Sequence, residues 1–157
     1  MKATNPRPVV FIGSSKESLT PAREIQSLLS HDDVIPRPWT DGFRPSATTI
    51  ENLEREMHTA DFAILVLAAD DLVESRAVKQ AAPRDNVVWE HGFFVGGIGR
   101  ERVFIVKPRS LDLKLPSDWA GITLLDYNPD GTPDDLSSRL GSVVNDIRKE
   151  INRLKSK

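Results

Sequence analysis

The sequence predicts an α/β protein in which a central parallel sheet of about five strands carries helices on both faces. Short runs that are apolar at every position recur along the chain, and amphipathic helical patterns lie between them. Fully apolar runs are typical of strands buried on both faces of a parallel sheet. Strands that alternate with helices imply right-handed crossovers, and therefore a doubly wound sandwich.

The expected strands are short and rich in β-branched residues. They are VVFIG at 9–13, VIPRPW at 34–39, FAILVL at 62–67, VFIV at 103–106 and ITLL at 122–125. The second run contains two prolines, which lack the amide hydrogen that a central strand uses, so we expect it near an edge of the sheet.

Three helices are indicated by a start signal followed by an apolar stripe. The first begins with Thr20 as N-cap and Pro21 as first helical residue, the second has Thr48 or Thr49 as its cap, and the third follows the capping signature TPDD at 132–135. The stripes are Ala22, Ile25, Leu28 and Leu29, then Ile50, Leu53, Met57 and Ala60, then Leu136, Leu140, Val143, Ile147, Ile151 and Leu154.

The chain of 157 residues has room for one domain, with 28% charged and 39% apolar residues. A net charge of -2 gives no reason to expect nucleic acid or an anionic membrane as a partner. Cysteine is absent, which excludes disulfides and thiolate metal sites, and MKATNPRP is not a secretory signal, so we expect a cytoplasmic protein. The scattered histidines show no zinc spacing, so no metal is expected.

Ligands of open α/β sheets bind outside the carboxyl ends of the strands. This rule selects Gly13-Ser14-Ser15-Lys16, the loop from Trp39 to Phe43, and Asp70-Asp71. The sequence contains neither G-x-G-x-x-G nor a Walker loop, so any nucleotide must be held in another way. Loops are expected at 13–18, 40–49, 70–86 and 107–121.

RDNVVWEHGFFVGG at 84–97 places a carboxylate among apolar residues and glycines. Asp85 or Asn86 caps the predicted helix, whose first turn then holds Glu90 on the same side as Asn86. The helix dipole stabilises an anion there by about 0.3–1 kcal/mol. An interior glycine lowers the stability of a helix by about 1 kcal/mol relative to alanine. The presence of several glycines therefore predicts that this helix packs closely on the sheet or on another backbone; they are Gly92, Gly96, Gly97 and Gly99.

These residues alone leave two interpretations of Glu90 open, because it either lines a site or pairs with an arginine such as Arg84. Trp39 and Phe43 equally suit the core, because aromatic side chains pack more often than they stack on ligands. The remaining candidates have structural readings too, Ser14 and Ser15 as turn formers and Asp61 and His91 as structural groups.

Five segments resemble a bacterial family of TIR-like domains once described as nucleotide-binding proteins. They are VFIGSSKE, PRPWTDGF, ADFAILVLAADD, PRDNVVWEHGFFVGGIGRERVFIV and DWAGITLLDY, in the family's order and at its approximate spacing over residues 8–150. The family includes TIR domains fused to bacterial STING and to other cyclic-nucleotide sensors of anti-phage defence. RDNVVWEHGFFVG is the most specific segment.

The resemblance implies a flavodoxin-like TIR fold and, as in many relatives, cleavage of NAD+ to nicotinamide and linear or cyclic ADP-ribose. The family's catalytic glutamate falls on Glu90, whereas His91 stands where many members are apolar and receives no role. The implied substrate-binding residues are Ser14, Ser15, Lys16, Trp39, Phe43, Arg84 and Asn86. NAD+ is then the substrate, with no metal or other cofactor, and the implied partners are further TIR copies and a fused or separate cyclic-nucleotide sensor.

A single carboxylate is chemically sufficient for this reaction. Ordinary glycosidases need a second carboxyl group to protonate an alkoxide leaving group, whereas the pyridinium of NAD+ departs as neutral nicotinamide. Glu90 then has only to stabilise an oxocarbenium-like ribose, by its charge or through the ribose hydroxyls.

Two other functions stay open at this point. A TIR domain can be a scaffold that signals by assembly without catalysis, and nucleoside hydrolases or deoxyribosyltransferases share a similar architecture and a catalytic glutamate. We expect the 157 residues to be a single TIR-like domain that serves as the effector part of a longer protein.

Overall fold

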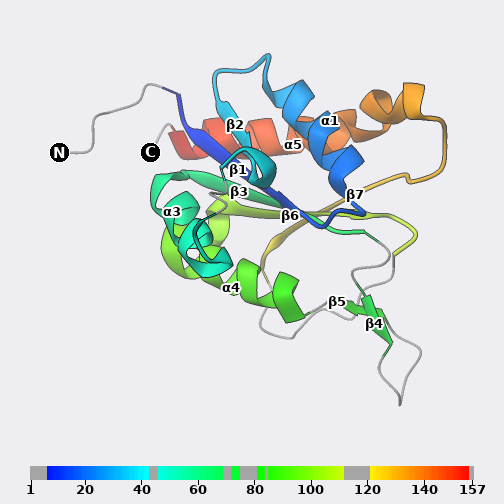
Figure 1. Ribbon diagram of the computed structural model, residues 1–157. Helices are drawn as coiled ribbons and strands as arrows, with labels where there is room; N and C mark the ends of the chain where they lie inside the picture. Colours follow the sequence, from blue (N-terminus) through cyan, green and yellow to red (C-terminus); the bar gives the residue numbers. More distant parts are fainter. Residues whose placement is uncertain are drawn as a thin grey trace.

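The computed structural model describes residues 7–42, 46–68, 72–74, 81–83, 85–111 and 121–155, and for 72–74, 81–83 and 85–87 it describes the backbone alone. A parallel sheet forms the centre of the molecule, with helices above and below it (Figure 1). Its strands are β1 (Val9–Ser14), β2 (Ile35–Pro38), β3 (Phe62–Val66), β6 (Val103–Pro108) and β7 (Thr123–Tyr127).

The strand order β2-β1-β3-β6-β7 is that of flavodoxin-like folds. All four neighbouring pairs run parallel. The predicted fold class is therefore confirmed, and so is the edge position of the proline-containing strand β2. In this order β1 is an interior strand, and its carboxyl end lies between those of β2 and β3.

Two pairs of helices cover the two faces of the sheet (Figure 1). On one face lie α1 (Leu19–Leu29) and α5 (Leu136–Lys155), and on the other lie α3 (Thr49–Thr59) and α4 (Asp85–Ile98). Three short helical elements lie between the strands and these helices: α2 (Trp39–Gly42), η2 (Arg100–Arg102) and η4 (Pro133–Asp135).

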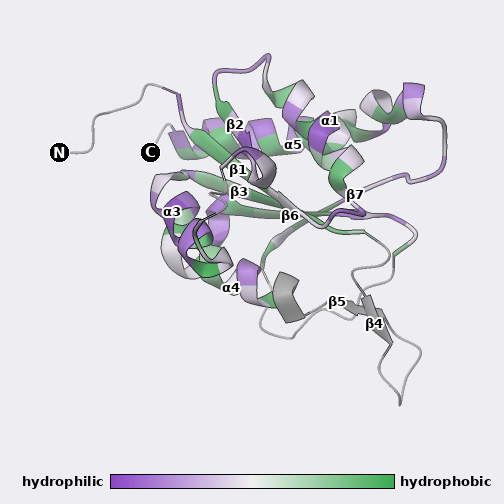
Figure 2. Cartoon of the chain, viewed as in Figure 1, coloured by the Kyte–Doolittle hydropathy of each residue, from purple (hydrophilic) through white to green (hydrophobic). Residues whose placement is uncertain are grey.

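The hydrophobic core forms two layers because successive side chains of a strand point to opposite faces. Val10 and Ile12 of β1 pack under α1 and α5, whereas Phe11 between them packs toward α3 and α4. Figure 2 shows the same division, with hydrophobic residues along the strands and along the inner faces of the helices. The residues that follow β1 are thereby held rigidly at the edge of the sheet.

Two helix starts differ from the prediction. The N-cap of α1 is Ser18 and not Thr20. Ser18 is buried, and its hydroxyl donates to the carbonyl of Val66 across 2.9 Å. Pro21 is tolerated inside the first turn because the amide hydrogens there have no partner within the helix. Likewise Thr132 makes no side-chain cap bond and precedes the 3₁₀ turn η4, so that α5 begins only at Leu136.

Three further expectations are wrong for the described residues. The last strand is not buried on both faces, because β7 is an edge strand and Leu124 is 37% exposed. The expected loop at 70–86 contains a small antiparallel pair, β4 (Leu72–Glu74) and β5 (Ala81–Pro83). Of the predicted glycines, only Gly97 approaches another element closely, since a Cβ there would overlap the Met57 side chain of α3. A Cβ on Gly92, Gly96 or Gly99 would have no described neighbour within 4 Å beyond its own stretch of chain.

The start of α3 is fixed by a reciprocal pair of hydrogen bonds, which selects Thr48 over Thr49 as the cap. The Thr48 hydroxyl accepts from the amide of Glu51 across 3.2 Å, and a Glu51 carboxylate oxygen accepts from the amide of Thr48 across 2.7 Å. These bonds lower the pKa of Glu51, because they stabilise its charged form.

Thr48→Ala is expected to lower the free energy of unfolding by about 1 kcal/mol, because it removes the acceptor for the amide of Glu51. Thr49→Ala is the matched control, since Thr49 is the first helical residue and caps nothing. Chemical denaturation of both variants measures the difference. An equal loss in the two variants would contradict the assignment of the cap.

Candidate functional site

A pocket lies at the carboxyl ends of β1 and β2, where the rule for open sheets places a ligand. Its volume is about 290 Å³. The residues that line it are Phe11, Gly13 and Ser14 of β1, Trp39 of α2, Thr49 and Leu53 of α3, and Glu90 of α4. Three of the predicted site residues, Ser14, Trp39 and Glu90, are thus brought together from three separate elements.

Trp39 and Ser14 are joined by a hydrogen bond in which the indole nitrogen Nε1 donates to the Ser14 hydroxyl oxygen across 3.0 Å. The register of the sheet explains this contact, because Ile12 pairs with Pro38, the residue before Trp39. A hydroxyl that accepts one bond still has its own hydrogen to donate. Ser14 therefore offers a donor at the pocket, and the bond to it orients the Trp39 ring.

The apolar part of the pocket is formed by rigid core residues. Phe11 is 1% exposed and stacks on Phe94 of α4 with ring centroids 4.8 Å apart. Leu53 is buried in the same cluster. A side chain at Gly13 would crowd its neighbours, because a Cβ would lie 2.9 Å from Leu65 Cδ2 and 3.1 Å from Phe11 Cε1. Because Gly13 has no side chain, the end of β1 leaves space at the pocket.

Glu90 is half-buried on α4, between exposed Trp89 and buried His91. Because α4 begins at Asp85, Glu90 is its sixth residue and belongs to the second turn, not to the first turn as predicted. The helix dipole acts mainly within the first turn, so the predicted stabilisation of the anion by the dipole does not carry over to this position. Glu90 lies at the pocket because α4 packs beside β3 and β6.

His91 points into the protein, away from the surface that carries Trp89, and is 3% exposed. Burial lowers its pKa below the ordinary value of about 6.5, because the charged imidazolium is poorly solvated there. This location agrees with the structural reading of His91, and it is not among the residues that line the pocket.

The free energy of unfolding is expected to fall on acidification because of His91. Its pKa is lower in the folded protein than in the unfolded chain, so the unfolded chain binds the proton first. The stability is fully present above about pH 6.5 and is lost as the pH falls through the folded-state pKa. Denaturation curves measured from pH 7.5 downward should show this slope, and it should be smaller in His91→Leu. His31→Gln, at an exposed position, serves as the control. An identical slope in His91→Leu and the parent would contradict the assignment.

The other predicted site residues lie elsewhere or outside the described part of the chain. The Ser15 hydroxyl lies 3.0 Å from that of Ser18, within the turn that leads into α1, and Lys16 is exposed. Neither lines the pocket, and their substrate roles stay predictions. Phe43 and Arg84 are outside the described residues, as is the side chain of Asn86.

Three residues that line the pocket were not predicted from the sequence: Phe11, Thr49 and Leu53. Thr49 and Leu53 are four residues apart on α3 and so share one face of the helix. In the sequence, Thr49 is a candidate helix cap and Leu53 is part of an apolar stripe, and neither pattern indicates a ligand. Asp61 is structural as expected, because its carboxylate accepts from the amide of Val9 across 2.9 Å.

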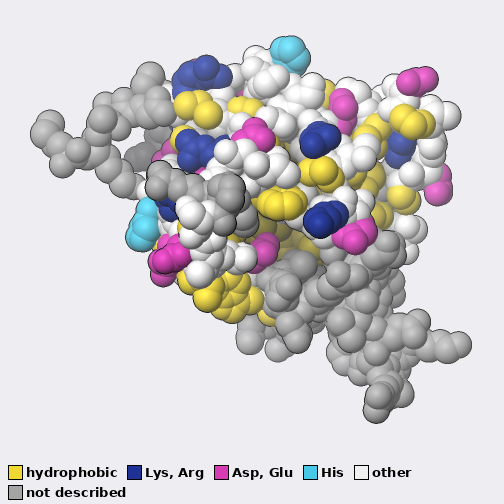
Figure 3. Space-filling model, viewed as in Figure 1, with side chains coloured by type: hydrophobic (Ala, Val, Ile, Leu, Met, Phe, Trp, Pro, Cys, Tyr) yellow, Lys and Arg dark blue, Asp and Glu magenta, His cyan; other side chains and the backbone are white. Residues whose placement is uncertain are grey.

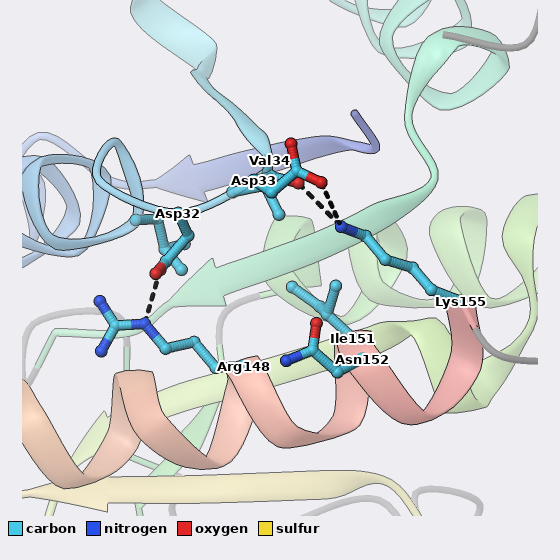
Figure 4. A pocket seen from close by; sticks show the side chains of 8 residues that line it. Asp32, Asp33, Val34, Arg148, Ile151, Asn152 and Lys155 are labelled. Carbon is cyan, nitrogen blue, oxygen red and sulfur yellow. Dashed lines mark hydrogen bonds and ion pairs between the residues drawn. The ribbon is translucent and has the colours of Figure 1, made fainter. Parts of the chain in front are cut away.

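A second cavity, of about 210 Å³, lies near the amino end of β2, between the α1–β2 connection and α5 (Figure 4). It separates the α1–β2 connection from the carboxyl-terminal half of α5. Its charges are paired: Arg148 Nε lies 2.5 Å from Asp32 Oδ2, and Lys155 Nζ lies 3.6 Å from Asp33 Oδ2 and donates to the Asp33 carbonyl across 2.8 Å. These pairs tie α5 to the connection, so we read this cavity as structural.

The described residues offer neither a metal site nor a membrane span. Within the described ranges, no three His, Cys, Asp or Glu side chains gather so that they could hold a metal ion. None of the helices in that part of the chain is long and apolar enough to cross a bilayer.

Comparison with known proteins gives a family match over most of the chain. Residues 9–129 match the family described as CAP12/Pycsar effector protein, TIR domain. A Pycsar effector protein of Burkholderia cepacia is 39% identical over 143 residues, which are 90% of this chain and 47% of the relative. A Pycsar effector protein of Pseudomonas aeruginosa is 41% identical over 146 residues, 92% of this chain and 47% of the relative.

A third relative carries a different name. CD-NTase-associated protein 12 of Sphingobacterium faecium is 37% identical over 142 residues, 90% of this chain and 42% of that protein. The chain thus spans about half the length of the relatives it matches. Among solved structures, a diflavin flavoprotein A3 of Nostoc sp. aligns with 92% of this chain and 97% of its own at 14% identity and a TM-score of 0.48. The fold assignment rests on the strand order, to which this last likeness adds nothing.

Proposed function

Because the chain belongs to the family of CAP12/Pycsar effector TIR domains, we propose that it is an NAD+ glycohydrolase that acts in anti-phage defence. The family match confirms the resemblance to TIR-like domains that five segments of the sequence indicated. The observation that carries the proposed activity is the meeting of Glu90, Ser14 and Trp39 in one pocket at the carboxyl edge of the sheet.

The pocket suits one half of a dinucleotide. Its volume of about 290 Å³ lies near the lower limit of about 300 Å³ for pockets that bind small molecules, so the rest of NAD+ extends beyond it. The Trp39 indole offers a flat surface for the nicotinamide ring, and the hydroxyls of Ser14 and Thr49 suit the polar groups of nicotinamide and ribose. Glu90 supplies the charge that the reaction requires.

In the proposed reaction the bond between ribose C1′ and the pyridinium nitrogen breaks, and its electron pair neutralises the ring. The ribose becomes oxocarbenium-like, and the Glu90 carboxylate stabilises that positive charge in a partly desolvated pocket. Water then adds at C1′ and loses a proton, which yields ADP-ribose. An internal nucleophile in place of water yields the cyclic product.

The proposal includes activation by self-association and by a cyclic-nucleotide sensor, fused or separate. Support for self-association comes from α4, where Trp89 is 45% exposed and stacks on Phe93 with ring centroids 5.2 Å apart. Figure 3 shows exposed hydrophobic side chains in the region of α3 and α4. Support for the sensor comes from the relatives, which are about twice as long as this chain and are named effectors or CD-NTase-associated.

The test is to incubate the chain with NAD+, with and without enforced clustering through a fused tetrameric coiled coil, and to follow nicotinamide by chromatography. We expect nicotinamide release that rises on clustering. Parallel incubations with nucleosides and deoxynucleosides distinguish a nucleoside hydrolase or deoxyribosyltransferase, which would release free bases. Association of the chain without any NAD+ consumption under clustering would overturn the proposal in favour of a non-catalytic scaffold, the function that the exposed Trp89 also suits.

A further inference from the structure

Glu56 of α3 is a buried carboxylate that the site described above does not use. Its side chain is 3% exposed, and its Oε2 lies 3.3 Å from Nη1 of Arg37 on β2. Arg37 also donates to the Thr59 hydroxyl across 3.0 Å. A buried carboxylate is costly unless it is paired, so Glu56 and Arg37 are held to each other. The pair therefore fixes α3 against the strand that leads into Trp39.

The same carboxylate touches the backbone of α2. A Cβ on Gly42, the last residue of α2, would lie 2.8 Å from Glu56 Cδ and would overlap Glu56 Oε1. A side chain on Gly42 would therefore displace the Glu56 carboxylate. Gly42 thus suits the close approach of Glu56 and not an unusual backbone angle, since its φ is not positive.

Arg55, next to Glu56 on α3, holds the end of α2 by a second contact. Its Nη2 donates to the Gly42 carbonyl and also to Asn52 Oδ1, the latter across 2.9 Å. Carbonyls at the end of a helix have no partner within it and need one from outside. The four residues of α2 are too few to form a stable helix alone, so its shape depends on these contacts with α3.

We infer that Glu56 and Arg55 are positioning residues, which hold the turn Trp39–Gly42 so that the Trp39 indole stays at the pocket beside Ser14. One helix then serves two purposes: Thr49 and Leu53 line the pocket, while Arg55 and Glu56 hold the turn that carries Trp39. The effect on NAD+ rests on the proposed function, whereas the positioning of Trp39 does not.

A fluorescence experiment tests the positioning directly. In a chain whose other two tryptophans are replaced, Trp89→Phe and Trp119→Phe, Trp39 is the only tryptophan that remains. We expect Glu56→Gln and Gly42→Ala each to increase quenching of Trp39 by acrylamide, because the indole becomes more mobile and accessible. Glu54→Gln, at an exposed position on the same helix, is the matched control and should leave quenching unchanged. Far-ultraviolet circular dichroism verifies that each variant is folded, and Glu56→Gln preserves the size of the side chain.

Kinetics in the clustered chain with all three tryptophans test the consequence for NAD+. We expect Glu56→Gln to raise KM by about tenfold with a smaller change in kcat, since a displaced binding group costs up to about 10²-fold. Parent-like quenching of Trp39 in both Glu56→Gln and Gly42→Ala would overturn the inference, even where the parent cleaves NAD+. If the parent releases no nicotinamide, the proposed function fails, and the quenching still decides whether Trp39 is positioned from α3.

Discussion

Replacing Glu90 with glutamine is expected to lower the kcat for nicotinamide release by about 10²- to 10³-fold, the usual cost of removing one electrostatic contact to a transition state. Glutamine keeps the size of the side chain and removes the charge that, in the proposed reaction, faces the oxocarbenium-like ribose. Because that charge acts on the transition state more than on bound NAD+, KM should change far less than kcat.

The measurement is nicotinamide release by the clustered protein over a range of NAD+ concentrations. Glu54→Gln makes the same chemical change at an exposed position, and this variant should behave like the parent. A Glu90→Gln protein with the kcat of the parent would remove Glu90 from the mechanism. It would favour the reading in which Glu90 only pairs with a neighbouring cation.

Phe11→Ala is expected to lower the free energy of unfolding by about 3–5 kcal/mol. Phe11 is 1% exposed, stacks on Phe94 with an angle of 20° between the ring planes, and forms part of the pocket wall. Truncation removes the buried ring and leaves a void between β1 and α4 that the surrounding backbone cannot close. Domains are stable by only about 5–15 kcal/mol, so this one change removes a large part of the total.

Denaturation in urea measures this loss. Phe11→Leu keeps most of the volume and should cost less than about 1.5 kcal/mol. Leu124→Ala, on the edge strand β7, changes a side chain that is 37% exposed and should fall within about 0.5 kcal/mol of the parent. A Phe11→Ala protein as stable as Leu124→Ala would show that the stack on Phe94 contributes nothing to the fold.

The sheet could be predicted from the sequence because its signals are local. A run such as FAILVL is apolar at every position wherever a strand is covered on both faces, and the prolines of β2 indicate an edge strand without knowledge of its neighbours. The cap of α1 could not be predicted in the same way. Ser18 is chosen over Thr20 by a hydrogen bond to Val66, which lies 48 residues away.

The candidate site shows the same limit. The carboxyl-edge rule selected Ser14 and Trp39, and the resemblance to TIR-like domains selected Glu90. Thr49 and Leu53 line the same pocket, but their pattern in the sequence is that of an ordinary amphipathic helix. Only the packing of α3 beside β1 brings them there. The sequence likewise does not indicate that Gly42 lies against a carboxylate 14 residues later.

The ion pairs that join α5 to the residues before β2 have a consequence for how the chain folds. Arg148 reaches back across 116 residues to Asp32, and Lys155 across 122 residues to the Asp33 carbonyl. Contacts of such high sequence separation raise the contact order, and closing so large a loop costs entropy before any contact forms. The sheet face around Val10 and Ile12, which α1 covers in part, is therefore completed only when α5 docks. During synthesis, this face of β1 therefore stays partly uncovered until the last of the described helices has been made.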